Sequence, residues 1–195
     1  MEPLNIFVLI VIVSVFVGNL GGAKQGIQDK ITKPEFRSNS YLQNTPPLFL
    51  ALISLFQVIA VFGVTNWIPE SLIPESGRWA AALFFALFSF FQIVSYKKLG
   101  KNYSTEIVIF KKHQVISEGF YKFSRHPQYF FQIVADLCCG IALLNPLIFG
   151  LTLFGSLPLL ILRAKEEERL LNKYLKNEYS AYSLKTAFFL PFIKI

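Results

Sequence analysis

Two polar segments of the 195-residue chain carry the side chains whose types and spacing suit chemistry. The first, Lys97 to Pro127, ends in Arg125-His126-Pro127, and the second, Arg163 to Tyr182, begins with Arg163-x3-Glu167. In a helix, Arg163 and Glu167 share one face, which is also the apolar face of the segment, so this ion pair is predicted to point into the protein. An arginine held in this way can bind a carboxylate through two parallel hydrogen bonds.

Both segments also have simpler interpretations. Arg125 and His126 suit contacts with lipid head groups, and the Arg163–Glu167 pair suits a solvated surface, where such pairs contribute about 0.3 to 0.5 kcal/mol. Three consecutive acids at 166–168 argue against a solvated surface, because beside an anionic leaflet they need a neighbouring cation or hydrogen-bond donor. No metal site is indicated, since the two histidines form no zinc motif and Cys138 and Cys139 are neighbours in an apolar run, as small core residues are.

The elements that must position these segments are predicted to be membrane helices. Hydrophobic residues make up 53% of the chain and charged residues 16%, and the mean hydropathy is +0.48, which excludes a soluble domain. Apolar spans run from about Leu4 to Leu20, Pro46 to Ile68, Trp79 to Tyr96 and Gln128 to Leu162, and Asn145-Pro146 divides the last into a helical hairpin. The prediction is one all-α integral membrane domain over residues 1–195, with three transmembrane helices in residues 1–96 and two in residues 97–195.

The distribution of basic residues gives the orientation of these five spans. With the N-terminus outside, the inside segments 21–45, 97–127 and 163–195 hold 18 of the 19 Lys and Arg residues, and only Arg78 lies outside. Cytoplasmic loops are enriched in Lys and Arg. We therefore expect the C-terminus and both polar segments in the cytoplasm. The net charge of +7 reflects this topology and does not indicate nucleic-acid binding.

The motifs in the polar segments resemble those of the isoprenylcysteine carboxyl methyltransferase family. The resemblance rests on Gly119-Phe-Tyr-Lys-Phe-Ser-Arg-His-Pro-Gln-Tyr129, on Arg163-x3-Glu167-Glu168 and on Glu178-Tyr179-x2-Tyr182. Asn145-Pro146 and the closing Leu190-Pro-Phe-Ile-Lys194 fit it as well. It covers the chain from about His113 to the end, and the short five-span form is similar to the prokaryotic members. Phospholipid N-methyltransferases and integral-membrane sterol reductases share parts of this region.

This resemblance implies an S-adenosylmethionine-dependent methyltransferase whose cofactor site is completed by a cytosolic C-terminal helical segment. The implied acceptor is a prenylated cysteine or another lipophilic molecule delivered through membrane lipid, and no oligomeric state is implied. Arg163 is the implied catalytic and substrate-binding residue, and Glu106 is a further candidate at the cofactor. The implied cofactor-binding residues are His113, Gln114, Val115, Ile116, Tyr121, His126, Pro127, Gln128, Tyr129 and Glu167.

Carboxyl methylation needs no general base, because a carboxylate with a pKa near about 3.5 is ionised at neutral pH. Rate enhancement then comes from alignment and exclusion of water, with Arg163 holding the carboxylate. Three alternatives stay open: N-methylation of phosphatidylethanolamine, which requires a base such as His126; sterol-type reduction by NADPH; and a non-catalytic membrane protein. A lipid tail would enter between spans, where a group of phenylalanines either admits it or only packs: Phe84, Phe85, Phe88, Phe130 and Phe131.

Asp136 is the only charged residue within a predicted span. A charge at that depth costs about 2.5 to 3.5 kcal/mol on insertion scales, so such residues are functional by default. Asp136 therefore predicts either a proton or substrate role, or a carboxyl hydrogen-bonded to Gln57, Gln92 or Gln132.

Overall fold

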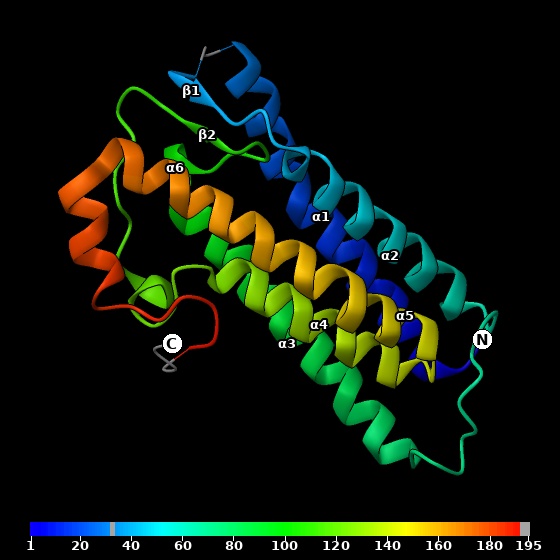
Figure 1. The fold of residues 1–195 in the computed structure, drawn as a ribbon. Coiled ribbons are helices and arrows are strands. Elements are labelled where there is room, and N and C mark those ends of the chain that lie inside the picture. Colours follow the sequence, from blue (N-terminus) through cyan, green and yellow to red (C-terminus); the bar gives the residue numbers. More distant parts are fainter. Residues whose placement is uncertain (32–33, 192–195) are drawn as a thin grey trace.

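The computed structural model describes residues 1–31 and 34–191 and forms a bundle of helices that run along one common direction (Figure 1). The α-helices are α1 (Pro3–Ile31), α2 (Thr45–Val61), α3 (Glu75–Leu99), α4 (Pro127–Ala142), α5 (Pro146–Leu151) and α6 (Leu157–Ser183). Short helical turns are η1 (Tyr41–Gln43), η2 (Gly100–Asn102), η3 (Gly119–Lys122) and the π-helical η4 (Thr152–Ser156). The closing Leu190-to-Lys194 motif lies outside the described residues from its third position onward.

Two very short strands correct the expectation of an all-helical chain. Strand β1 (Phe36–Arg37) pairs antiparallel with β2 (Val108–Ile109). Backbone hydrogen bonds from Glu35 to Ile109 (2.9 Å) and from Ser38 to Ile107 (3.0 Å) extend the pairing at both ends. Two residues are too few to show the alternating pattern from which a strand is predicted. The ribbon ties the segment before α2 to the segment after α3.

Four helical stretches in the described residues are long and apolar enough to cross a membrane: Pro3–Leu20, Tyr41–Val61, Glu75–Asn102 and Pro146–Ser183. They match four of the five predicted spans. The remaining one, α4, has 16 residues and is therefore about 24 Å long, shorter than the roughly 30 Å of a bilayer core. The N-terminus lies at the end of the bundle opposite the C-terminal region (Figure 1). An odd number of crossings produces this arrangement, but the fifth crossing stays a prediction.

The predicted hairpin joins α4 to the helix that follows it. Asn145 at the turn is fully buried, accepts a hydrogen bond from the Ile148 amide (2.9 Å) and donates one to the Thr65 hydroxyl (2.7 Å). It therefore caps α5 and fastens the turn to the connection between α2 and α3. Gly140 permits the close approach of the two arms, because a Cβ there would lie 3.0 Å from the Phe149 amide nitrogen.

The second arm of the hairpin runs through α5, η4 and α6 without a break. Pro158 lacks a backbone N–H, and in a regular α-helix its ring clashes with the carbonyl four residues earlier. The wider π-helical turn η4 lies directly before this proline and accommodates it. The second arm can therefore extend well past the apolar core and carry Arg163 and the acidic residues into the polar end of the bundle.

Helix α6 changes direction sharply at Lys176, where φ is 39° and ψ is −114°. Such backbone values cost a residue with a Cβ on the order of 1 to 3 kcal/mol. Beyond Lys176 the chain folds back toward the bundle (Figure 1), and the buried Tyr179 donates a hydrogen bond from its hydroxyl to Glu168 (3.1 Å). The turn thus returns the predicted Glu178-to-Tyr182 motif to the acidic residues of its own helix.

The apolar core lies where α1, α3 and α4 meet, and small residues let these helices approach closely. The buried small residues include Ala81, Ala82, Ala135, Cys139 and Ala142. Cys138 and Cys139 are both free, and Cys139 is fully buried, which confirms that they are packing residues.

Arg78, the basic residue expected outside, is buried and donates hydrogen bonds to Glu2 (2.9 Å) and to the Ala142 carbonyl (3.2 Å).

Candidate functional site

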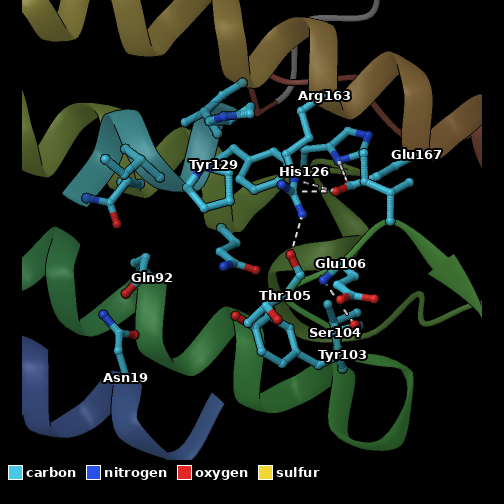
Figure 2. A pocket seen from close by; sticks show the side chains of 18 of the residues that line it. Asn19, Gln92, Tyr103, Ser104, Thr105, Glu106, His126, Tyr129, Arg163 and Glu167 are labelled. Atoms are coloured by element: carbon cyan, nitrogen blue, oxygen red, sulfur yellow. Dashed lines mark hydrogen bonds and ion pairs between the residues drawn. The ribbon is translucent and has the colours of Figure 1, made fainter. Parts of the chain in front are cut away.

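A cavity of about 930 Å³ lies inside the bundle. The loop of residues 102–116, the start of α4 and the middle of α6 form its polar end (Figure 2). Helices α1, α2 and α3 form its apolar end. Four residues that line this end, Val13, Phe16, Leu55 and Val58, are also 36% to 67% exposed. The cavity therefore reaches the lipid-facing surface at α1 and α2.

Arg163 is the central residue of the polar end. Its side chain is 4% exposed and points from α6 into the site (Figure 2). The Nε donates to the Glu167 carboxylate (3.0 Å) and to the Tyr129 hydroxyl (2.9 Å). The Nη1 and Nη2 atoms donate to three backbone carbonyls, those of Leu42 (3.2 Å), Gln43 (3.1 Å) and Thr105 (2.8 Å). One N–H of Nη2 has no partner among the described residues. Arg163 thus fastens three separate segments around the cavity.

Glu167 and Tyr129 form the wall beside Arg163. The Tyr129 hydroxyl donates to Glu167 at 2.5 Å, and the His126 ring lies parallel to the Tyr129 ring with centroids 5.8 Å apart. His126 Nδ1 is 3.7 Å from Glu167, and His126 Nε2 is 3.2 Å from Glu168. This confirms the prediction that the Arg163–Glu167 pair faces the protein interior.

Glu168 organises a second cluster behind this wall. It accepts hydrogen bonds from Arg125 Nε (2.5 Å) and from the Tyr179 hydroxyl. Arg125 also donates to the carbonyls of Ser183 (2.8 Å) and Thr186 (2.6 Å), so it holds the returning C-terminal segment. The third acid, Glu166, bonds Ser38 (2.6 Å) and Arg169. Each of the three consecutive acids, Glu166, Glu167 and Glu168, therefore has a neighbouring cation or hydrogen-bond donor, as predicted from the sequence.

The loop over the polar end rests on the apolar stripe predicted for α6. Leu42, Ile107 and Ile109 form one buried cluster with Leu170, and the Tyr174 ring stacks on Phe36 with centroids 3.6 Å apart. The Gln43 side chain accepts a hydrogen bond from the Ile107 amide (2.9 Å). The two connections that cover the site are therefore bound to each other and to α6.

Two buried polar atoms that belong to cavity-lining residues have no hydrogen-bond partner in the described structure: Nδ1 of His113 and Oε1 of Gln92. Burial lowers the pKa of His113, so its imidazole is neutral at pH 7. Burial likewise raises the pKa of Tyr121 well above its usual value, which keeps its hydroxyl protonated. Unpaired buried polar atoms are costly, and a ligand that pairs them gains the corresponding free energy.

The structure brings almost all of the predicted site residues to this one cavity. Those that line it are His113, Gln114, Val115, Ile116, Tyr121, His126, Gln128, Tyr129, Arg163 and Glu167. Pro127 is the exception, because it is fully buried as the first residue of α4 and does not line the cavity. It begins the helix that carries the site residues. Glu106 lines the cavity, but its carboxylate is paired with Arg37 (2.7 Å).

The five phenylalanines considered for tail entry mostly lie away from the cavity. Only Phe85 among the five lines the cavity. Phe84 is 51% exposed, whereas Phe88 and Phe131 belong to an aromatic cluster with ring centroids 6.1 Å apart. Phe88 and Phe131 pack, which is the simpler of their two interpretations, and the apolar end of the cavity is lined mainly by α1 and α2.

Sequence reasoning missed the contribution of the loop that follows α3. Tyr103, Ser104 and Thr105 line the cavity, and Figure 2 shows them facing Arg163 and Tyr129 across it. Thr105 acts through its backbone carbonyl, which no side-chain pattern reveals. Tyr182 also lines the cavity and donates from its hydroxyl to the Tyr121 carbonyl (2.8 Å). Tyr182 could have been predicted as a site residue from its place in the Glu178-Tyr179-x2-Tyr182 motif.

The fold and the site together define a helical membrane protein with an internal cavity that is polar at one end and open to lipid at the other. Residues 80–173 match the family model of the isoprenylcysteine carboxyl methyltransferase (ICMT) family. The fold resembles the solved structure of the eukaryotic intramembrane Ras methyltransferase ICMT, with a TM-score of 0.67 and 20% identity. That likeness covers 100% of this chain and 70% of the eukaryotic one. A comparison with curated protein sequences gave no match.

Proposed function

We propose that the protein is an S-adenosylmethionine-dependent methyltransferase that esterifies the carboxylate of an S-prenylated cysteine. The observation that carries this proposal is a cavity in which Tyr129, Arg163 and Glu167 stand at the polar end while the apolar end reaches lipid. A water-soluble cofactor and a lipophilic acceptor can therefore meet inside the protein. The family match over residues 80–173 supports the same activity.

The residues present fit S-adenosylmethionine. Its amino-acid and ribose groups require a carboxylate and donors, its adenine requires backbone or ring nitrogens, and its sulfonium favours aromatic faces. Glu167 supplies the carboxylate, and the unpaired Nδ1 of His113 supplies a ring nitrogen. The residues proposed to hold the cofactor are His113, Gln114, Val115, Ile116, Tyr121, His126, Gln128, Tyr129 and Glu167.

The roles of the protein residues follow from their contacts. When bound, S-adenosylmethionine supplies a methyl group on a cationic sulfur. The chain has to hold a carboxylate oxygen in line with this methyl group and keep water away. The remaining N–H of Arg163 is proposed to bind the acceptor carboxylate, while its other N–H groups keep the walls in place. The loop that covers the polar end is proposed to exclude water.

The alternative of amine methylation is less well supported by the same contacts. An amine must lose a proton, so it requires a base. Both ring nitrogens of His126 face carboxylates, those of Glu167 and Glu168, and these carboxylates also pair with arginines. Neither ring nitrogen of His126 is therefore free to take a proton from an amine, whereas a carboxylate acceptor needs no base. Sterol reduction and a non-catalytic role remain as outcomes of the binding experiment below.

The orientation is proposed to be N-terminus outside and C-terminus, with the polar end of the cavity, in the cytoplasm. Five crossings with α4 as the short fourth one fit the opposite positions of the two ends of the chain (Figure 1). Single cysteines at the exposed positions Glu75 and Lys112, in a background with Cys138 and Cys139 replaced by alanine, test this. A membrane-impermeant maleimide added to intact cells is expected to label position 75 and not position 112. Equal labelling at both positions would refute the orientation.

Binding of S-adenosylhomocysteine to the purified protein tests the function directly. We expect the wild type to bind and Glu167→Gln to bind about tenfold or more weakly, because the substitution removes a charged acceptor from a site that is mostly buried. Glu178→Gln, at an exposed position of the same helix, is the matched control and is expected to bind as the wild type does. The second measurement is methyl transfer to N-acetyl-S-farnesylcysteine. Absence of any adenosyl-ligand binding in folded protein would point to the reductase or non-catalytic alternatives.

A further inference from the structure

The part of the cavity that lies within the membrane helices carries a cluster of polar side chains, which we call the inner polar cluster. Such side chains are unusual where the bundle is otherwise apolar, and each of them lines the cavity. They come from four helices, α1 to α4: Asn19, Ser54, Gln57, Ser89, Gln92, Gln132 and Asp136. Neither the family motifs nor the proposed methyl transfer uses this cluster.

Asp136 is the charged member of the inner polar cluster and is 2% exposed. It accepts hydrogen bonds from Nε2 of Gln57 (2.7 Å) and from Nε2 of Gln132 (3.0 and 3.1 Å). The expectation that glutamines satisfy this carboxyl is therefore confirmed for Gln57 and Gln132. Among the described residues no lysine, arginine or histidine bonds it. Both glutamines thus turn their side-chain nitrogens toward Asp136.

Gln92 leaves the inner polar cluster with an unused acceptor. Its side chain is 6% exposed, lines the cavity and has a buried Oε1 without a partner in the described structure (Figure 2). A plain hydrocarbon tail in the cavity would leave this oxygen unpaired. A ligand that carries an O–H group at this depth would pair it, and buried acceptors favour such a ligand strongly.

The position of the inner polar cluster along α4 indicates which part of the ligand would carry this O–H group. Tyr129, Gln132 and Asp136 are spaced i, i+3 and i+7, so they share the face of α4 that lines the cavity. At 1.5 Å per residue, Asp136 lies about 10 Å deeper than Tyr129 along the helix axis. A molecule whose carboxylate sits at Arg163 and Tyr129 therefore places the middle or far part of its tail beside the cluster.

We propose that the inner polar cluster is a binding subsite for a hydroxyl group on the tail of the acceptor. The chemical class is an oxygenated lipophilic thioether of cysteine, in which a hydroxyl on the prenyl or alkyl chain donates to Gln92 Oε1 or Asp136. This inference rests on the proposed function only for the identity of the head group. The subsite itself follows from the unpaired acceptor and the buried carboxylate.

The test compares pairs of ligands of equal length. N-acetyl-S-alkylcysteines with chains graded from octyl to tetradecyl are measured against the corresponding ω-hydroxyalkyl compounds, by equilibrium binding to the full-length protein in nanodiscs and by methyl transfer. At the length that reaches the cluster, we expect the hydroxyl compound to bind about tenfold more tightly than its alkyl partner. At shorter lengths the hydroxyl compound should bind more weakly, because its O–H is buried in the apolar part.

Two variants identify the residues responsible. Gln92→Met keeps the side-chain volume, and Asp136→Asn keeps the shape and removes the charge; each should reduce the preference for the hydroxyl compound to less than about threefold. Phe84→Leu, at a lipid-exposed position of α3 outside the cavity, should retain the full preference. If alkyl compounds bind as tightly as hydroxyl compounds at every length, the subsite is refuted even when methyl transfer occurs. If the hydroxyl preference is found but no compound is methylated, the subsite stands and the proposed function fails.

Discussion

Replacing Arg163 by leucine is expected to abolish S-adenosylhomocysteine binding and to destabilise the protein by roughly 4 kcal/mol or more. The substitution keeps much of the volume but removes donors to five acceptors in one step. The Glu167 carboxylate and the carbonyls of Leu42, Gln43 and Thr105 would all lose their guanidinium donors. Because these carbonyls belong to the two connections that cover the cavity, the polar end would lose its walls.

The matched control for this experiment is Arg169→Leu on the same helix. Arg169 is 74% exposed and pairs with Glu166 at 2.8 Å, so its loss should change neither ligand binding nor the midpoint of thermal unfolding noticeably. Arg163→Lys separates charge from geometry, since an ammonium has a single nitrogen and cannot span the acceptors that the three guanidinium nitrogens bond. We expect Arg163→Lys to fold but to bind S-adenosylhomocysteine at least tenfold more weakly. Wild-type binding by both Arg163 variants would contradict the role assigned to the guanidinium.

Replacing Glu168 by alanine is expected to be the second most damaging substitution, with a loss of about 3 kcal/mol in unfolding free energy. Glu168 has no direct place in the cavity wall, yet it bonds Arg125, His126 and Tyr179. The side chains of Arg125 and Glu168 are only 13% and 16% exposed, so the variant would leave a nearly buried guanidinium without its anion. The returning C-terminal segment should detach as a result.

Limited proteolysis measures this detachment separately from global unfolding. In Glu168→Ala we expect cleavage between residues 176 and 191 at protease concentrations that leave the wild type intact, together with a lower midpoint of thermal unfolding. Glu178→Ala, which removes an exposed acid beyond the Lys176 turn, is the control. Unchanged protease resistance of Glu168→Ala would mean that the backbone contacts of Arg125 suffice to hold this segment.

The inward direction of the Arg163–Glu167 pair could be predicted because helix periodicity is local information. A spacing of four residues fixes which side chains share a face, and Leu170 and Tyr174 identified that face as the packed one. The hairpin at Asn145-Pro146 could be predicted for a similar reason, since proline restricts its own backbone and that of the preceding residue. Both features depend on residues close together in the sequence.

The rest of the site depends on contacts that leave no sequence pattern. Arg163 bonds the carbonyls of Leu42, Gln43 and Thr105, and every residue type has a carbonyl. The sequence left open whether phenylalanines of α3 and α4 admit a lipid tail or only pack, because in a membrane protein lipid-facing and cavity-lining residues have the same apolar character. Only the packing of α1 and α2 distinguishes Phe16 or Leu55 from other exposed apolar residues.

The cavity opens toward lipid at Val13, Phe16, Leu55 and Val58. The protein therefore responds to the concentration of the acceptor in the bilayer and not to its concentration in the bulk suspension. An acceptor that arrives through this opening diffuses in two dimensions, and its occupancy depends on its mole fraction in the bilayer. Diluting the acceptor with inert phospholipid at constant bulk concentration should therefore slow methylation, whereas diluting the whole suspension with buffer should not. On the proposed function, the methylated product would leave along the same path without crossing water, so the lipid composition around the protein would set both supply and release.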